Sequence, residues 1–301
     1  MRKKVLDKAK NIILEKQFYA EKQAEENKMK ALENEAFKKA YQKYVSLIID
    51  NARQGLDETE ETKVLQQEYQ AILKQMGIKS ITPDYFCKKC NDYGFVEGKY
   101  CDCLIEEINN ILKEESGFLT LEEFETTTFE LSSNPDFSKA LYEKMKKWCH
   151  SAFAKTLIFL SGQTGVGKTH LMKCMANELI KRHKLVTLTS SFAMHQDFLK
   201  CYATKDLEEK QLILDKYLTA EILFIDDLGT ELRQPNLTVN MLYQVLNERK
   251  MKRMPTVITS NLTLEDVLDY YDERIASRIA DKETSVCVYI QGDDIRLKTN
   301  K

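Results

Sequence analysis

A phosphate-binding loop constrains the fold of this chain more than any other stretch. Residues 162–169 read Gly-Gln-Thr-Gly-Val-Gly-Lys-Thr, which matches the G-x-x-x-x-G-K-T pattern. An apolar run at 157–160 precedes the loop, and a helical pattern at 171–180 follows it. Because this is the strand–loop–helix order in which such loops bind phosphate, the sequence predicts a nucleotide-binding α/β domain.

The residue types of the loop suit ATP and Mg²⁺. Glycines let backbone N–H groups approach phosphate oxygens without a Cβ in the way, and the helix that follows attracts anions at its N-terminus. We expect Lys168 to reach the β- and γ-phosphates and the Thr169 hydroxyl to ligate Mg²⁺. The predicted nucleotide-binding residues of the loop are Gly162, Gln163, Thr164, Gly165, Val166, Gly167, Lys168 and Thr169.

From residue 138 onward, apolar runs alternate with helical patterns, which favours a parallel sheet with helices on both faces. A helix is expected at 139–152, ahead of the first strand. Cys174 and Cys287 lie in apolar patterns and are expected to be small core residues. The five strand candidates are 157–160, 185–189, 222–225, 256–259 and 286–290.

Two adjacent carboxylates, Asp226 and Asp227, end the third strand candidate. Asp226 at the strand end is expected to hold Mg²⁺, directly or through water, and Asp227 to orient or deprotonate the attacking water. Adjacent aspartates also occur at helix caps and turns. The phosphate-binding loop upstream favours the catalytic interpretation.

Three further polar residues have two interpretations each. Asn261 follows the fourth strand, where it either hydrogen-bonds the γ-phosphate or caps the helix near Thr263. Arg274 and Arg278 lie four residues apart and share one helix face. The planar guanidinium suits a γ-phosphate, yet on the residues alone an ordinary surface pair is the simpler interpretation.

Four of the eight cysteines form two pairs around a stretch that contains Gly94 and Gly98. The glycines predict a β-hairpin, which would bring the thiolates together as a structural zinc site. Zn²⁺ would let a small segment fold without a large core. Free or redox-active thiols are the alternative, and the tight C-x-C pair leaves open whether all four bind. The candidate zinc ligands are Cys87, Cys90, Cys101 and Cys103.

The N-terminal third is predicted to be helical. Residues 1–54 lack Gly and Pro and are rich in helix formers, and Gly55 suits the position that ends a helix. A second helix is expected from about Asp57 to Met76, with Gly77 ending it. The region is interpreted either as a solvated helical hairpin or as an arm that docks a partner protein.

Residues 114–137 are expected to form a linker, because Thr126-Thr-Thr and Ser132-Ser-Asn-Pro are turn and loop chemistry. Phe124 and Phe129 are expected to pack on the domain that follows.

Composition limits the location and partners. A length of 301 residues allows roughly two domains. The net charge of −2 does not indicate nucleic-acid binding, so a local patch would be needed. No apolar run approaches the ~20 residues that span a bilayer, and no signal peptide follows the basic start. The expectation is a cytoplasmic protein without a membrane partner.

Taken in order, the loop, the Asp-Asp pair, the strand-end Asn and the E-R-x-x-S-R segment resemble AAA+ ATPases of the initiator clade, above all the DnaC/DnaI-type replicative helicase loaders. The Cys-rich segment and the Phe-x-x-x-x-Phe linker are similar to DnaI-like and phage-borne members. The resemblance covers about residues 85–297, and the N-terminal helices match only in character.

This resemblance implies a P-loop AAA+ domain with a five-stranded parallel sheet, preceded by a helical N-terminal region and a small Cys-rich zinc-binding segment. The expected boundaries are 1–80 for the helical partner-binding region, 81–113 for the Cys-rich segment, 114–137 for the linker and 138–301 for the ATPase domain.

The resemblance also implies roles for single residues. Asn261 corresponds to sensor 1 and Arg278 to the arginine finger, which reaches the nucleotide of a neighbouring subunit; Arg274 is a second trans-acting candidate. Arg296 is a sensor 2 candidate, although the sequence ends before the helical lid of most AAA+ proteins. Initiator-type proteins grip single-stranded DNA with an extra helix where this chain has 192–218. A plain amphipathic helix pair is the alternative there. The side chains suited to DNA are Phe192, Lys200, Tyr202, Lys205 and Lys210.

The implied function is an ATPase that binds a hexameric replicative helicase, places it on single-stranded DNA and forms a homo-oligomer with ATP. The alternative is an IstB-type transposition helper ATPase acting on duplex DNA, which is expected to lack the zinc-type segment. A non-hydrolysing adaptor is a third option, against which the Asp226–Asp227 pair argues.

Overall fold

The computed structural model describes residues 3–56, 59–116, 120–232 and 234–298. The chain divides into two compact units, Lys10–Cys103 and Met1–Ala9 with Leu104–Lys301. Within the described residues, no helix combines the length and the apolar character needed to cross a membrane.

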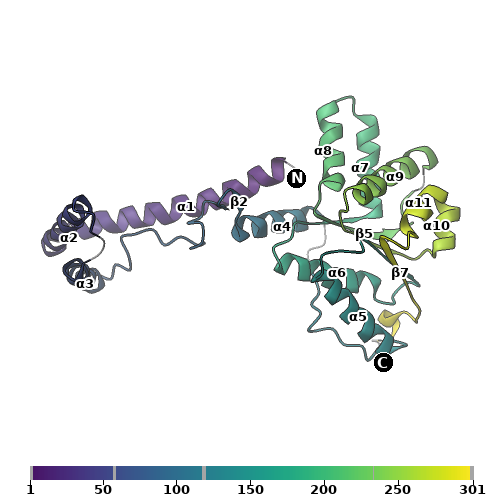
Figure 1. The fold of residues 1–301 in the computed structure, drawn as a ribbon, viewed down its shortest axis with the longest axis horizontal. Helices are drawn as coiled ribbons and strands as arrows, with labels where there is room; N and C mark the ends of the chain where they lie inside the picture. The colour runs from purple at the N-terminus through teal and green to yellow at the C-terminus, as the bar shows by residue number, and fades with distance from the viewer. Residues whose placement is uncertain (1–2, 57–58, 117–119, 233, 299–301) are drawn as a thin grey trace. The chain divides into compact units, whose positions relative to one another are not determined.

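The larger unit is built on a five-stranded parallel sheet with the strand order β4-β5-β6-β3-β7. The predicted five-stranded parallel sheet is therefore confirmed. Figure 1 labels two of its strands, β5 and β7. The largest difference is at the third predicted strand, which continues three residues past 225 to include both aspartates. The strands are β3 Leu157–Gly162, β4 Val186–Ser190, β5 Ile222–Leu228, β6 Thr256–Ser260 and β7 Ser285–Ile290.

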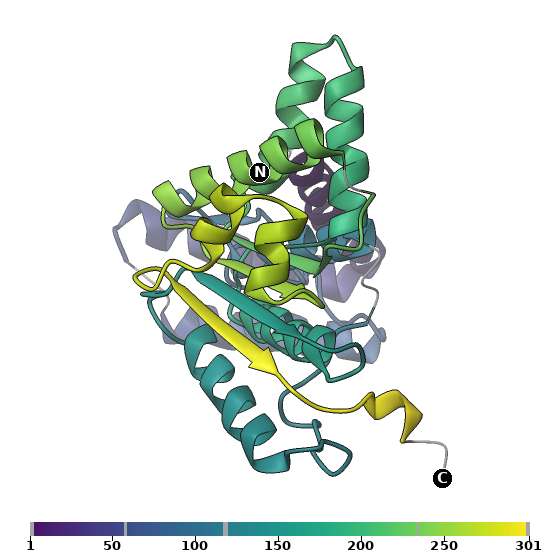
Figure 2. The ribbon, with the colours of Figure 1, turned by 90° about the vertical axis from the view of Figure 1, so that its right-hand side faces the viewer.

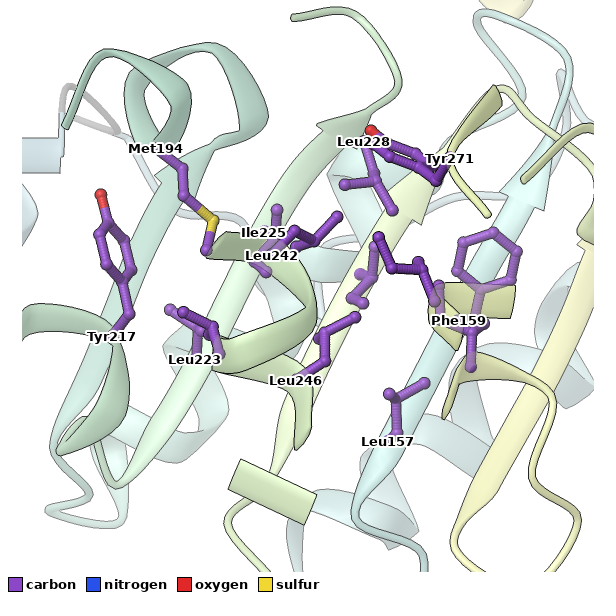
Figure 3. Close-up of a cluster of buried hydrophobic side chains, with 14 of the residues drawn as sticks. Leu157, Phe159, Met194, Tyr217, Leu223, Ile225, Leu228, Leu242, Leu246 and Tyr271 are labelled. Atoms are coloured by element: carbon purple, nitrogen blue, oxygen red, sulfur yellow. The ribbon is translucent and has the colours of Figure 1, made fainter. Parts of the chain in front are cut away.

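Helices cover both faces of this sheet (Figure 2). Residues of β3 alternate between two cores: Leu157 and Phe159 pack with α7 to α11, whereas Ile158 and Leu160 pack with α5 and α6. Figure 3 shows the first core, where α9 lies over the sheet. The helices are α4 Asp102–Ser116, α5 Pro135–Cys149, α6 Lys168–Lys181, α7 Ser191–Ala203, α8 Leu207–Leu218, α9 Pro235–Met251, α10 Leu264–Tyr270 and α11 Glu273–Ile279, followed by the 3₁₀ turn η1 Ile295–Leu297.

The strand order determines where a site can form. β3 lies between β6 and β7, and β5 lies on the far side of β6. Because the strands are parallel, their carboxyl ends share one edge of the sheet, which is where ligands bind in open α/β sheets. Gly162, Asp226 and Asn261 are thereby brought to one edge.

Two details differ from the sequence-based expectations. The helix that precedes β3 begins at Pro135 rather than 139, because the Asn134 side chain caps it and proline suits the first helical position. Cys174 is buried, as expected, but Cys287 is exposed, so the expectation of a core role for Cys287 is wrong. In the described sheet β7 pairs on one side only, with β3, which leaves the middle of this edge strand partly uncovered.

The smaller unit contains α1 Lys3–Leu32, most of which belongs to it, with α2 Glu35–Arg53 and α3 Glu60–Gln75. The helical region predicted up to residue 54 is interrupted at Glu33–Asn34, where the Asn34 side chain accepts from the Phe37 N–H and starts a new helix. Gly55 and Gly77 follow α2 and α3 in the left-handed conformation, as expected.

Two features complete this unit. The cap of α3 is Thr59, which forms a capping box with Thr62, whereas Asp57, the expected start, lies outside the described residues. The ends of the three helices share a small core, which includes Phe37 of α2 and Tyr69 of α3 in edge-to-face contact.

Candidate nucleotide-binding site

The P-loop joins β3 to α6 with a backbone that only glycine fits. Gly162 has φ +147°, and a Cβ there would lie 2.1 Å from the Ile290 carbonyl oxygen of β7. Gly165 has φ +78°, and a Cβ there would lie 1.9 Å from the Asp294 carboxylate. The loop is therefore packed against the chain segment that follows β7, and larger residues at these two positions would displace it.

Lys168 is the first residue of α6, and its ammonium group lies against the loop. It donates to the carbonyl oxygens of Gly162 and Gln163 at 2.8 and 2.7 Å, and to the Oδ1 atom of Asn261 at 2.8 Å. Burial lowers the pKa of Lys168 from its ordinary value, against the opposing effect of Asp227 and Asp226. The structure thus brings the predicted P-loop lysine and the predicted sensor residue into direct contact.

The two candidate Mg²⁺ ligands are hydrogen-bonded to each other. The Thr169 hydroxyl donates to Oδ1 of Asp226 at 3.0 Å, and the Thr259 hydroxyl donates to the same oxygen. Burial raises the pKa of Asp226, and the charge on neighbouring Asp227 raises it further, while the two hydroxyl donors lower it. A hydroxyl and a carboxylate oxygen in this arrangement are hard ligands of the kind that Mg²⁺ prefers.

Asp227 lies at an irregularity in β5. The pairing of β5 with β6 shifts register between Ile225 and Leu228, and Asp227 has φ +54°, rare for a residue with a side chain. Its N–H donates to the Thr259 hydroxyl at 2.9 Å, and its carbonyl accepts from the Ser191 hydroxyl at 2.7 Å. These bonds hold the strained backbone, which places Asp227 in the wall of the cavity described next.

A cavity of about 510 Å³ opens over the loop. Its lining joins the P-loop, Asp227 and Asn261 to residues that were not assigned to the site from the sequence, namely linker residues 126–129, 131 and 132, Tyr142 of α5 and His170 of α6. The Tyr142 hydroxyl lies 3.0 Å from Nδ1 of His170, and burial lowers the pKa of that imidazole. Only the position of His170 directly after Thr169 hinted at this wall.

The linker is part of the site. Phe124 and Phe129 both contact the Tyr142 ring edge to face, with ring centroids 6.1 and 5.0 Å away, which confirms that they pack on the domain. The chain after β7 closes the other side, because the Ile295 N–H donates to the Gly165 carbonyl at 3.0 Å. Arg296 lines the cavity and pairs with Asp294 at 2.9 Å.

Arg274 and Arg278 lie away from this cavity. Both guanidinium groups stack on the ring of Tyr243 in α9, 5.1 and 5.4 Å from its centroid. Arg278 also borders a small cavity with Leu157 and Thr256, the first residues of β3 and β6. Arg278 therefore lies toward the amino edge of the sheet, opposite the P-loop, and neither arginine lines the nucleotide cavity.

The four clustered cysteines form a candidate metal centre in the smaller unit. Their sulfur atoms all lie within 4.8 Å of one another, with Cys87–Cys101 at 3.7 Å and Cys90–Cys103 at 3.4 Å. Four sulfurs about 2.3 Å from a tetrahedral zinc ion would be roughly 3.8 Å apart, so the donor set fits Zn²⁺.

Local structure supports this cluster. β1 Phe95–Val96 and β2 Lys99–Tyr100 form the predicted antiparallel hairpin. The Asp92 carboxylate accepts from the N–H groups of Phe86 and Cys87 at 2.8 and 2.7 Å and fixes the turn that carries the first cysteine pair.

The α7–α8 pair carries the predicted DNA-contacting residues. The two helices project from the sheet as a hairpin (Figure 2). Phe192 and Tyr202 are 52% and 78% exposed, and Lys200 and Lys205 are also exposed, whereas Lys210 is half-buried.

Comparison with known proteins identifies the family. The model of the IstB-like ATP-binding protein family matches residues 120–301. The uncharacterized protein YqaM of Bacillus subtilis (strain 168) is 32% identical over 232 residues, which cover 73% of this chain and 70% of YqaM. The replicative helicase loader DnaC of Escherichia coli (strain K12) is 27% identical over 121 residues, 40% of this chain and 48% of DnaC. A crystal structure of DnaI aligns with 58% of this chain and 90% of its own at 20% identity and a TM-score of 0.46. The matched segment contains the whole nucleotide site described above, and the chain belongs to the IstB-like ATP-binding protein family.

Proposed function

We propose that this protein is an ATP-hydrolysing loader that places a replicative DNA helicase on single-stranded DNA in the cytoplasm. The observation that carries the proposal is a candidate ATP site where Lys168, Asn261 and the Asp226–Asp227 pair meet at one edge of the sheet, while two arginines suited to phosphate lie outside its cavity. The similarity to DnaC, a replicative helicase loader, supports the proposed biological role.

Each residue of the site is assigned a role in ATP binding or hydrolysis. Lys168 leaves its carbonyl partners for the phosphate oxygens, and the Asp227 carboxylate orients the attacking water or accepts its proton. Thr169 and Asp226 would hold Mg²⁺, which neutralises phosphate charge when bound. Asn261 hydrogen-bonds the γ-phosphate or its water.

The arginine pair implies an oligomer. Arg278 and Arg274 are proposed to complete the site of a neighbouring subunit, because neither lines the nucleotide cavity of its own chain. A cationic finger of this kind contributes about 10³–10⁵ in rate in other nucleotide hydrolases. We therefore propose a homo-oligomer in the presence of ATP, with Arg296 contributing to the nucleotide of its own chain.

The N-terminal region is proposed to bind the helicase. Leu14 and Phe18 lie one turn apart on α1 and are 51% and 67% exposed, and Phe86 beside the cysteine cluster is 80% exposed. Exposed apolar groups of this size are typical of protein interfaces. Residues 1–80 would form the docking arm, 81–113 its zinc-stabilised base and 114–137 the linker to the ATPase domain, 138–301.

The α7–α8 hairpin is proposed to contact single-stranded DNA. The exposed rings of Phe192 and Tyr202 offer stacking surfaces for bases, and Lys200 and Lys205 offer charge to the backbone. Binding of this kind weakens as salt increases, because the lysines replace counterions on the phosphates.

A loading assay tests the proposal. The purified chain is mixed with the replicative helicase encoded in the same genome and with circular single-stranded DNA, and transfer of the helicase to DNA is measured with ATP. A functional loader increases the DNA-bound helicase, and the Lys168→Ala variant does not. Failure to bind the helicase at micromolar concentration would contradict the proposal.

The family match supports one alternative, a transposition helper ATPase that acts on duplex DNA. This function predicts retention of duplex DNA with ATP and recovery of a transposase. The cysteine cluster and the helical unit before the matched segment favour the loader. Binding to circular single-stranded DNA and to duplex DNA, measured side by side with ATP, distinguishes the two functions.

A further inference from the structure

A buried carboxylate that the proposed chemistry does not use lies just after the Walker B strand. Glu231 is 4% exposed. One of its carboxylate oxygens accepts from the Tyr271 hydroxyl, and the other accepts from the Gly229 N–H at 3.0 Å. Its backbone carbonyl accepts from the Tyr270 hydroxyl at 2.9 Å. Burying a carboxylate among neutral donors costs desolvation free energy, which suggests that Glu231 has a role beyond packing.

On one side Glu231 is tied to Asp227. The Thr230 N–H and hydroxyl both donate to the Asp227 carbonyl, at 3.2 and 2.9 Å, so that residues 227–231 form one tight turn. Gly229 inside the turn has φ +100°, and a Cβ there would lie 2.5 Å from Leu262, the residue after Asn261. The Glu231 carboxylate therefore closes a turn that begins at Asp227 and packs against Leu262, the neighbour of Asn261.

On the other side Glu231 is tied to the arginine helix. Tyr271 ends α10, and Asp272 caps α11 by accepting from the Ile275 N–H. The same Asp272 carboxylate accepts from Nε of Arg274 at 2.8 Å. Arg274 thus follows Tyr271, the partner of Glu231, by three positions, and one helical turn separates Arg274 from Arg278.

We propose that Glu231 is a positioning residue that holds Arg274 and Arg278 in register with the Asp227 turn of the same chain. The inference rests on the proposed role of these arginines at the neighbouring subunit's ATP. In this proposal, the nucleotide site of one chain is rigidly connected to the two arginines that the same chain presents to its neighbour. A shift of the Asp227 turn then moves the arginine pair by way of Tyr271.

Mixed assemblies separate this role from simple support of the fold. A Lys168→Ala chain serves only as arginine donor, and an Arg278→Ala chain serves only as nucleotide acceptor. Glu231→Gln is placed in either the donor or the acceptor, and Tyr271→Phe in the donor removes the hydroxyl alone. Glu265→Gln, an exposed glutamate on α10, is the matched control. Thermal unfolding and co-assembly are measured for every chain.

We expect the unmodified donor and acceptor to restore hydrolysis, and the Glu265→Gln donor to do so equally. The Glu231→Gln and Tyr271→Phe donors should lower the restored rate by roughly tenfold or more, because small displacements of a catalytic group are costly, while the acceptor's KM for ATP stays unchanged. Glu231→Gln in the acceptor should have a smaller effect than in the donor.

Two results would overturn the inference, and each identifies which part of it is wrong. If the unmodified pair restores nothing although the chains co-assemble, the trans role of the arginines fails and the inference falls with it. If the unmodified pair restores hydrolysis and both modified donors work equally well, or if Glu231→Gln acts only in the acceptor, the positioning role alone is wrong. If Glu231→Gln does not fold, Tyr271→Phe decides by the same comparison.

Discussion

The Lys168 ammonium donates to Oδ1 of Asn261 across 2.8 Å, which joins the start of α6 to the loop after β6. Since the same ammonium also donates to two loop carbonyls, a γ-phosphate must compete for it with three neutral oxygens. Such acceptors release an ammonium readily to a charged phosphate, and we therefore expect Asn261 to respond when Lys168 moves.

Substitutions of Asn261 test this relationship. Asn261→Ala removes one neutral acceptor and should leave the affinity for ATP within about fivefold, since a neutral hydrogen bond contributes about 1 kcal/mol, yet it should slow hydrolysis. Asn261→Asp places a carboxylate beside Lys168 and the phosphates and should weaken ATP binding. Titration with a fluorescent ATP analogue and a phosphate-release assay measure the two effects. Tighter binding by the Asp variant would contradict the expected competition.

Lys168 and Asp227 should separate binding from turnover. Lys168→Ala removes the cation that pairs with phosphate and should weaken nucleotide binding. Asp227→Asn keeps the shape of the strained turn but loses the charge, so it should bind ATP and not hydrolyse it. Equilibrium binding and steady-state hydrolysis of the purified variants are the measurements. Wild-type turnover by Asp227→Asn would remove the catalytic role assigned to this carboxylate.

The acid side of the pH–rate profile should report Asp226. Burial raises its pKa, so the carboxylate is protonated, and loses Mg²⁺ affinity, at a higher pH than an ordinary aspartate. The Thr259 hydroxyl opposes this shift by donating to Asp226. Thr259→Val should therefore move the acid limb of kcat/KM for Mg-ATP to higher pH, and Thr259→Ser should restore it. An acid limb that stays in place in Thr259→Val would contradict the assignment.

The motifs predicted the sheet and its carboxyl edge because glycine spacing and apolar runs are local signals. They could not predict the wall formed by Tyr142 and linker residues 126–129, 131 and 132, since that wall depends on how α5 packs on α6. The break at Asn34 had a weak local signal, because Asn favours helix N-caps over helix interiors, but the helix formers on both sides of it outweighed that signal.

The roles of Glu231 and Tyr243 were hidden for a related reason. Neither residue lies in a motif, and each acquires meaning only when a distant element approaches: α10 brings Tyr271 to Glu231, and α11 brings two arginines to Tyr243. The expectation that Cys287 is a core residue was wrong, because an apolar strand pattern does not indicate whether the strand lies at the edge of the sheet.

Zinc should be present at one ion per chain. The four sulfur atoms of Cys87, Cys90, Cys101 and Cys103 are already gathered, so metal analysis of protein prepared under reducing, chelator-free conditions should find it. Cys90→Ser should lose the metal, whereas Cys287→Ser, at an exposed cysteine outside the cluster, should retain it. Chelation should disturb helicase binding more than ATP binding, because the ATPase unit has its own cores. Metal-free protein with full helicase binding would reject the site.

The last prediction concerns the ring that holds the arginine pair. Tyr243 stacks against both guanidinium groups, and its hydroxyl accepts from Arg278 at 3.3 Å. Tyr243→Phe keeps the ring and should retain most activity. Tyr243→Ala removes a cation–π contact of about 0.5–2 kcal/mol for each arginine, so hydrolysis should fall by roughly tenfold.

Because the ring does not line the nucleotide cavity, its loss should not change how the same chain binds ATP. Two arginine donors are then compared with the same Arg278→Ala acceptor. The donor that carries both Lys168→Ala and Tyr243→Ala should restore less hydrolysis than the donor that carries Lys168→Ala alone. Tyr289→Ala, at a half-exposed tyrosine on β7, is the matched control and should restore as much. If Tyr243→Ala instead weakened ATP binding in its own chain and donated arginines normally, the pair would have to be assigned to the stability of α9 and α11 rather than to the neighbouring site.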